Sequence, residues 1–293
     1  MYHLSRADHP MHHMIANITK AVMQQRLQNA PELAEELIPK EFPVGCRRLT
    51  PGEGYLEAMQ APNAKYEGMP IVKITETGIE TEGGDIEDFD LIVCATGFDT
   101  TFKPRWKIVG RETVSAVPSD DPKSYFGITF ADKPNYFKFN GPSGANGHGS
   151  EMQHKMWTTD YILKWCEKMA REDIRSFCVK QEAVDDFYVY CQELLKRTVW
   201  SGHCRSWYNS GKKGGRVTAL YGGSILHWKG IAFTVISSYE NKCKANPLIE
   251  MVENIRGEDF DIRYNSKNRF RFMGNGFTNL EMAGGDMAYY LTK

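Results

Sequence analysis

The sequence predicts an α/β fold, and three patterns carry that prediction. The run Phe89–Ala95 is apolar throughout after Asp90, which predicts a strand buried on both faces, as in the parallel sheet of nucleotide-binding domains. A second buried strand, Tyr136–Phe139, is predicted just before the glycine-rich loop Gly141–Gly149, and a helix is predicted to begin near Ser150. A strand, a glycine loop and a helix in this order are typical of α/β proteins.

The N-terminal part of the chain predicts two helices and then a turn region. Helical spacing of four apolar residues predicts one buried face for the first helix: Ile15, Ile18, Val22 and Leu27. Pro31 suits the first position of a second, short helix that contains Leu33 and Leu37. The proline- and glycine-rich stretch Pro43–Gly54 follows and is the first candidate place for chemistry.

The next segments predict strands and turns. Apolar and polar residues alternate over Ile71–Thr75, which predicts a strand, and Thr77 and Gly78 predict a turn after it. A second, returning strand is predicted over Ile79–Thr81, and another turn over Glu82–Asp85. The buried strand over Phe89–Ala95 then ends at Thr96 and Gly97, where the backbone can approach a ligand closely.

The second half of the chain predicts two amphipathic helices and an irregular region. The helix after the glycine loop is predicted to bury one face, formed by Met152, Met156, Ile162, Cys166 and Met169. Residues 174–179 alternate as a strand, and the following helix is predicted to turn Val184, Phe187, Cys191 and Leu194 inward. The stretch 200–228 is rich in loops and aromatic residues, and a short strand-like pattern closes the chain at 268–276.

Composition limits the classes of function. The 293 residues carry 36 Lys+Arg against 37 Asp+Glu, a formal net charge of −1, which argues against nucleic acid as a partner. No apolar run approaches the roughly 20 residues of a membrane-spanning helix, and the N-terminus lacks the apolar region of a secretory signal. Seven scattered cysteines without a CxxC pair predict core thiols in a reducing compartment, and neither a disulfide scaffold nor a zinc site. We therefore expect a cytoplasmic protein with no metal site.

Three features of the loops are candidates for ligand binding. The segment Phe137–Glu151 can aim the N–H groups of a helix at an anion or an electron-rich ring, although its glycines also suit plain tight turns. Arg47 and Arg48 can form an anion clamp or simply an exposed basic pair on a loop. His148 is a candidate ligand contact, without an identifiable partner in the sequence. Other residues have simpler explanations, namely a frayed terminus or core packing: His9, His12, His13, Trp200, Trp207 and Trp228. The chain contains neither GxGxxG nor GxxxxGK[ST], so the dinucleotide fingerprint of a Rossmann domain is absent.

Four ordered segments carry a family resemblance. They are Gly45–Glu57 (GCRRLTPGEGYLE), Val93–Asp99 (VCATGFD), Pro134–Pro142 with Gly147–Gly149, and Trp200–Tyr208 (WSGHCRSWY) followed by Ala219–His227. Together they resemble the class B flavoprotein monooxygenases, specifically the fungal Baeyer–Villiger-type enzymes, and the pattern at 268–276 resembles the closing strand region of that family. The resemblance implies FAD and NADPH as cofactors, a ketone or aldehyde as substrate, and a role in secondary metabolism.

The resemblance also assigns roles to residues. In the family, an arginine six residues before the glycine of the GY[LY]E segment projects over the flavin, and that position is Arg48 here. A fixed guanidinium there would stabilise the anionic intermediates of oxygenation. Arg47 takes the position of a cation that meets the 2′-phosphate of NADPH, and Trp207 that of a tryptophan closing over nicotinamide and substrate. Six further residues fall on positions near FAD: Ala95, Thr96, Gly97, Asp99, Gly141 and Pro142.

The resemblance covers only the C-terminal half of such an enzyme. It predicts an incomplete FAD/NAD(P)-binding Rossmann-like fold, in which residues 1–42 are a remnant of the nicotinamide-binding domain with its return helices. Residues 43–293 would then be the C-terminal part of the FAD-binding domain, with the substrate loop near 200–228. Exposed apolar sheet edges would favour a homo-oligomer or a separate N-terminal half as partner. Two alternatives to an oxygenase stay open, a non-redox remnant (a ligand-binding module, isomerase or cyclase) and an inactive fragment.

Overall fold

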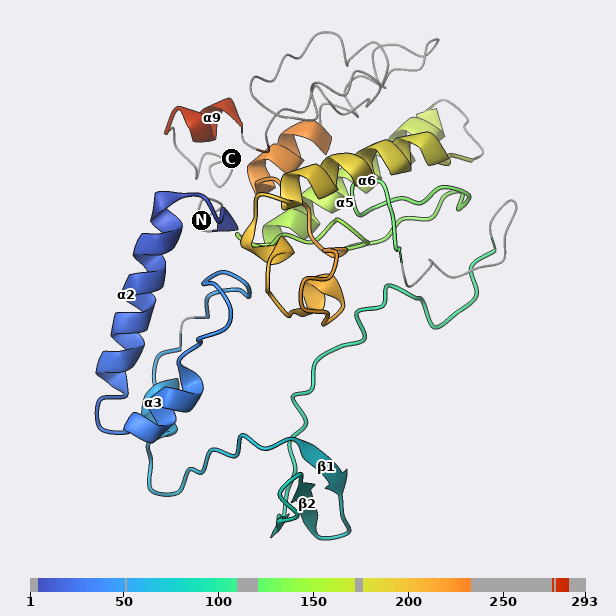
Figure 1. Ribbon diagram of the computed structural model, residues 1–293. Helices are drawn as coiled ribbons and strands as arrows, with labels where there is room; N and C mark the ends of the chain where they lie inside the picture. Colours follow the sequence, from blue (N-terminus) through green and yellow to red (C-terminus); the bar gives the residue numbers. More distant parts are fainter. Residues whose placement is uncertain are drawn as a thin grey trace. The chain divides into compact units, whose positions relative to one another are not determined.

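The computed structural model describes residues 5–50, 52–109, 121–171, 176–232, 276 and 278–284 (Figure 1). The chain divides into two compact units. Unit 1 comprises Met1–His13, Phe42–Leu49 and Thr100–Lys293, and unit 2 comprises Met14–Glu41 and Thr50–Asp99. Both helices and strands are present. The predicted pattern at 268–276 lies outside the described residues except for Gly276, as do the first two residues of the strand predicted over 174–179.

Unit 2 contains short helices around a small apolar cluster. Helix α2 (Pro10–Arg26) enters it from unit 1, and α3 (Pro31–Leu37) and α4 (Tyr55–Ala58) follow, with Pro31 opening α3 as predicted. The buried cluster forms around Leu27, Ile38 and Leu56. The predicted buried face of α2 is therefore wrong, because only the end of that face at Leu27 meets the cluster, while Ile18 and Val22 are exposed.

The sheet of unit 2 has three antiparallel strands in the order β1-β2-β3: β1 (Ile71–Ile74), β2 (Gly78–Thr81) and β3 (Ile86–Asp88). The first two strands were predicted. Gly78, predicted as a turn residue, is instead the first residue of β2 and pairs with Asp88. A methyl group on Gly78 would lie 1.9 Å from the carbonyl oxygen of Glu87, so this close strand pairing requires glycine.

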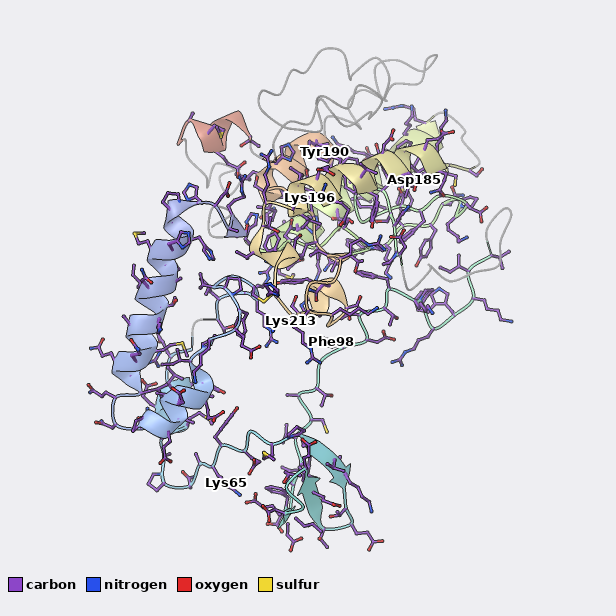
Figure 2. All side chains as sticks on the ribbon, in the orientation of Figure 1. Lys65, Phe98, Asp185, Tyr190, Lys196 and Lys213 are labelled. Atoms are coloured by element: carbon purple, nitrogen blue, oxygen red, sulfur yellow. A yellow bond between two sulfur atoms is a disulfide. The ribbon has the colours of Figure 1, made fainter. Side chains whose placement is uncertain are left out.

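The buried strand predicted over 89–95 is not observed. These residues form neither a strand nor a buried segment, and Val93 is 80% exposed. Figure 1 shows them as an extended trace after β3, and Figure 2 labels Phe98, which is 96% exposed, further along the same trace. A strand buried on both faces needs neighbouring strands and covering helices. The three strands described in unit 2 supply no such partner, because they pair only with one another.

Unit 1 is built around two helices, α5 (Glu151–Arg171) and α6 (Gln181–Leu195). The inward residues predicted for α6 are all buried, and α5 starts next to the predicted position. The predicted inward face of α5 is wrong, since Met152 is 69% exposed and Met156 and Cys166 are exposed as well. The buried face instead carries His154, Trp157, Thr158, Tyr161, Trp165 and Lys168. Its aromatic rings bury more apolar area than the methionines would, and this difference selects the face.

The rest of unit 1 is irregular. The strand predicted at Tyr136–Phe139 is reduced to a single bridge between Thr129 and Phe137, and Val179 makes a similar single bridge with Ala131. The stretch 200–228 is rich in loops, as predicted, with the short helices η1 (Val199–Ser201) and η2 (Trp207–Asn209). Residues 225–232 are helical, and α9 (Asn279–Met282) is the last described element. Among the described residues, no helix is long and apolar enough to cross a membrane.

Candidate functional site

Three loops of unit 1 come together at one place. We call them the arginine loop (Gly45–Leu49), the glycine loop (Gly141–Gly149) and the tryptophan loop (Trp200–Tyr208). The indole Nε1 of Trp200 donates to the carbonyl oxygen of Gly45 at 2.9 Å, and Nη2 of Arg47 donates to the carbonyl oxygen of Arg205 at 3.2 Å. These contacts hold the tryptophan loop against the arginine loop.

A disulfide between Cys46 and Cys204 joins the same two loops (Figure 2). Both cysteines are buried and lie 158 residues apart in the sequence. The prediction that all cysteines are thiols is therefore wrong for this pair. Four other described cysteines are thiols: Cys94, Cys166, Cys178 and Cys191. The spacing of the cysteines gave no sign of the pairing, because the bridge depends on two loops that meet only in the folded chain.

Arg48 connects the arginine loop to the glycine loop and to the start of α5. Its Nη1 donates to the carbonyl oxygen of Gly149 at 2.9 Å, and its Nη2 donates to the carbonyl oxygen of Asn146 at 2.6 Å and to Oε1 of Glu151 at 3.0 Å. The Arg48 side chain nevertheless remains 40% exposed. The guanidinium is thus fixed in direction while part of it faces outward, which is what recognition of an anionic group requires.

Glu151 is a functional candidate that the sequence reasoning missed. Besides Arg48, its Oε1 accepts from the backbone N–H of Asn146 at 3.1 Å, and its Oε2 accepts from Nδ2 of Asn140 at 3.4 Å. The carboxylate also occupies the first turn of α5, where the helix dipole favours negative charge. An acidic residue at the first position of a helix after a glycine loop was the sequence signal that could have indicated it.

A cavity of about 120 Å³ lies at the junction of the arginine and glycine loops, with Trp200 in its wall. Its lining residues are Ser5, Gly45, Arg47, Arg48, Leu49, Gly147, His148, Gly149 and Trp200. A methyl group on Gly147 would lie 2.1 Å from the Trp200 ring, so the close packing of loop on indole requires glycine. Burial, with a small contribution from the nearby Arg48 guanidinium, lowers the pKa of His148 to about 3. His148 therefore contributes a neutral imidazole to this wall at neutral pH.

Several buried polar atoms near the glycine loop have no hydrogen-bond partner among the described residues. They are the hydroxyl of Ser143, both amide atoms of Asn146, Oδ1 of Asn140 and both ring nitrogens of His154. Buried polar groups in folded proteins are nearly always paired with protein, water or a ligand. His154 is 2% exposed, and its burial lowers its pKa to about 4, so its ring is neutral as well. None of these four residues lines the cavity described above, so their polar atoms can meet a ligand only if the glycine loop shifts.

The predicted site residues fall into two groups. Arg47 and Arg48 line the cavity, and Trp207 stands in the tryptophan loop, 48% exposed, with its ring centre 4.8 Å from that of Tyr208. Gly141 and Pro142 are buried by backbone contacts of their own unit, since Gly127 accepts from the N–H of Gly141 at 2.8 Å and Ser124 donates to the carbonyl oxygen of Pro142 at 2.6 Å. The remaining predicted positions belong to unit 2, where all of them are exposed: Ala95, Thr96, Gly97 and Asp99.

The described part of the chain holds no group of three or more His, Cys, Asp or Glu side chains that could bind a metal ion.

The chain resembles known monooxygenases in sequence. It is 44% identical over 285 residues to the FAD-binding monooxygenase tazF of Aspergillus terreus, which covers 96% of this chain and 47% of that protein. It is 36% identical over 249 residues to the FAD-binding monooxygenase stcW of Emericella nidulans, covering 84% of this chain and 38% of that protein. A Baeyer-Villiger monooxygenase of Pseudomonas aeruginosa is 32% identical over 182 residues, or 61% of this chain and 34% of that protein. No family model matches the chain.

Solved structures show the same likeness in the fold. An oxidised steroid monooxygenase bound to NADP superposes with a TM-score of 0.63 at 25% identity, over 77% of this chain and 44% of that one. The closed crystal structure of cyclohexanone monooxygenase gives a TM-score of 0.67 at 24% identity, over 80% and 45%. The chain thus spans slightly less than half the length of these proteins. It is a homologue of the fungal FAD-binding monooxygenases and corresponds to about half of such a protein.

Proposed function

We propose that this chain forms the substrate-side part of a flavin-dependent monooxygenase of the Baeyer–Villiger type. The reaction would use FAD and NADPH to insert one oxygen atom into a ketone or aldehyde, in secondary metabolism. One observation carries the proposal: Arg48 is held by the glycine loop and Glu151 in the wall of a cavity, with part of its guanidinium left outward. The family resemblance of the flanking sequence supports the same assignment.

The polar side chains of the glycine loop are of a kind that could bind the isoalloxazine end of a flavin. The unpartnered amide of Asn146 and hydroxyl of Ser143 would offer donors and acceptors to the polar edge of an isoalloxazine ring, beside the start of α5. FAD reduced by NADPH would supply the oxygen-activating redox chemistry. The ADP end of FAD normally rests on a GxGxxG fingerprint, which this sequence does not contain. The chain would therefore supply the ring side of the cofactor site.

Arg48 would stabilise negative charge as it develops on the substrate oxygen. Hydrogen bonds to Asn146, Gly149 and Glu151 fix the direction of its guanidinium before the substrate arrives. Charge stabilisation by a group that needs no reorientation is among the largest contributions to catalysis. Glu151 and the carbonyl groups of Asn146 and Gly149 would act as positioning groups for this arginine.

Arg47 and Trp207 would serve the nicotinamide cofactor. Arg47 is exposed, with its guanidinium 5.6 Å from the ring centre of Phe42, so its charge is available to a phosphate group. Trp207 is half-exposed in a short helix capped by Ser206, and its indole can lie over a flat ring without leaving a packed core.

The experiment is a chimera in which this chain replaces the matching 285 residues of the Aspergillus terreus relative. NADPH oxidation and ester formation are followed with a panel of ketones, and the intact relative is the positive control. We expect the chimera to retain FAD and to form product, and Arg48→Ala to lower kcat by about 100-fold or more while FAD stays bound. Lys212→Ala, an exposed cation in unit 1, is the matched control and should leave kcat unchanged. A folded, FAD-loaded chimera in which Arg48→Ala forms product at the original rate would contradict the proposal.

A further inference from the structure

The Cys46–Cys204 disulfide sits between two loops that the proposed function uses together. The residues that follow the two cysteines, Arg47 and Arg205, are also in contact, through the hydrogen bond from Nη2 of Arg47 to the carbonyl oxygen of Arg205. Arg48 is two residues from one sulfur-bearing residue, and Trp207 is three residues from the other. The bridge thus fixes the separation of the arginine that would bind the substrate oxygen and the tryptophan that would cover it.

We propose that the Cys46–Cys204 bridge is a redox-sensitive clamp that holds the arginine loop against the tryptophan loop and releases them when it is reduced. The functional consequence rests on the proposed function, because the clamp positions Arg48 and Trp207 for that reaction. The clamp itself rests only on the disulfide and its surroundings.

The position of the bridge suits exchange with a dithiol. Both cysteines are buried, but their neighbours Arg47, His203 and Arg205 are exposed, so the two loops that carry the bridge face solvent. A modest opening of either loop therefore admits a reductant.

The chemistry is thiol–disulfide exchange with a cellular dithiol. A thiolate of the dithiol attacks one sulfur of the bridge, the Cys46–Cys204 bond breaks, and a mixed disulfide forms. The second thiol of the reductant then displaces the protein sulfur. The reductant leaves as an intramolecular disulfide, and Cys46 and Cys204 have gained two electrons and two protons as thiols. Reoxidation reverses each step and restores the bridge.

Reduction leaves weaker forces between the two loops. The contacts that remain include the hydrogen bonds from Trp200 to Gly45, from Arg47 to Arg205 and from Sγ of Cys204 to the carbonyl oxygen of Cys46, together with an interaction between Arg48 and the hydroxyl of Tyr208. A cross-link between residues 158 positions apart restricts the open states of the chain strongly, and its loss releases them. Helices α5 and α6 keep their own aromatic core, so the loss should stay local.

The bridge is tested first by peptide mapping of the full chain alkylated under denaturing, non-reducing conditions. We expect Cys46 and Cys204 in one linked peptide pair, and the exposed Cys94 and Cys166 in alkylated form. Hydrogen–deuterium exchange is then measured with and without dithiothreitol. Reduction should raise the exchange rate of residues 43–49 and 200–208 by about tenfold or more and leave α6 unchanged.

Two variants complete the test. Cys46→Ser/Cys204→Ser should show the fast loop exchange in both conditions, and Cys94→Ser should behave like the unmodified chain. The clamp would be overturned if Cys46 and Cys204 were found alkylated in the absence of reductant. It would also be overturned if dithiothreitol did not change the exchange rates of the two loops in the unmodified chain. Neither readout depends on flavin or NADPH, so a failure of the proposed monooxygenase activity is seen separately, in the chimera assay.

Discussion

At the scale of single residues, the function of Arg48 depends on groups that the sequence places far away. The acceptors on Asn146, Gly149 and Glu151 lie 98 to 103 residues further along the chain. Local spacing could therefore not decide between an anion clamp and an exposed basic pair. The family resemblance selected Arg48, but it did not indicate Glu151, whose carboxylate becomes relevant only when the glycine loop folds back onto the arginine loop.

The buried histidines make the stability of unit 1 dependent on pH. His154 is neutral in the folded chain because burial lowers its pKa to about 4, whereas in the unfolded chain it binds a proton near its ordinary pKa of about 6.5. The unfolded state therefore takes up more protons below pH 6.5. The stability that the neutral His154 provides is complete above pH 6.5 and is lost as the pH falls towards 4.

We expect His154 to contribute a decrease of about 1.4 kcal/mol in the free energy of unfolding for each pH unit between 6.5 and 4. Urea unfolding at a series of pH values measures this slope, and His154→Leu should flatten it by about that amount. His203→Gln, at an exposed histidine, is the control for the loss of an imidazole as such. Equal slopes for the unmodified chain and His154→Leu would show that His154 titrates normally in the folded chain.

At the scale of elements, the helices α3, α5 and α6 could be predicted, whereas α4 and the helix over 225–232 were not, and the buried strand predicted over 89–95 is not observed. The positions of α3, α5 and α6 follow from spacing, a proline and a glycine loop, all of which are local signals. The inward face of α5 could not be predicted from hydrophobicity alone, because methionines and aromatic residues offer two competing stripes on the same helix. Which stripe is buried depends on ring contacts such as that between Trp165 and Phe177, whose centres are 3.9 Å apart.

The glycine loop is shaped by its contact with the tryptophan loop. Gly147→Ala would place a methyl group 2.1 Å from the Trp200 ring, so the indole must move away from the carbonyl oxygen of Gly45. We expect this change to lower the free energy of unfolding by about 1–3 kcal/mol, as overpacking of a buried site does. Gly230→Ala is the control, since the added methyl group meets open space within a helix. Chemical denaturation of the two variants measures the difference, and equal stabilities would contradict the described packing.

At the scale of the whole molecule, the segment 89–95 has the composition of a buried strand, but the described residues do not bury it. Its composition predicts a buried strand, yet residues such as Leu91 and Val93 are exposed. The two fungal relatives are between two and three times as long as the part that this chain matches. A strand becomes buried on both faces only when neighbouring strands and covering helices assemble around it. The described residues of unit 2 do not provide them for the segment 89–95.

The two observed units are distinct from the two predicted domains. The division into units 1 and 2 is observed, whereas the assignment of residues 1–42 and 43–293 to nicotinamide- and FAD-binding domains stays a prediction. The flavin positions predicted in unit 2, Ala95 to Gly97 and Asp99, belong to the exposed segment. Those predicted in unit 1, Gly141 and Pro142, belong to the same glycine loop as Asn146, whose side-chain amide is unpartnered. Unit 1 is therefore the part of the chain that we expect to bind the flavin ring.

The most direct measurement of that claim is a titration of the purified chain with riboflavin and with FAD, followed by flavin fluorescence. The ring contacts proposed here are present in the chain, and the fingerprint for the ADP end is not. We expect both ligands to bind saturably, with dissociation constants within about threefold of each other, and Asn146→Leu to weaken both by about tenfold, the value of one lost hydrogen-bonding group at about 1.4 kcal/mol. A cooperatively folded chain that binds neither ligand would contradict the claim that this half of the molecule holds the flavin ring.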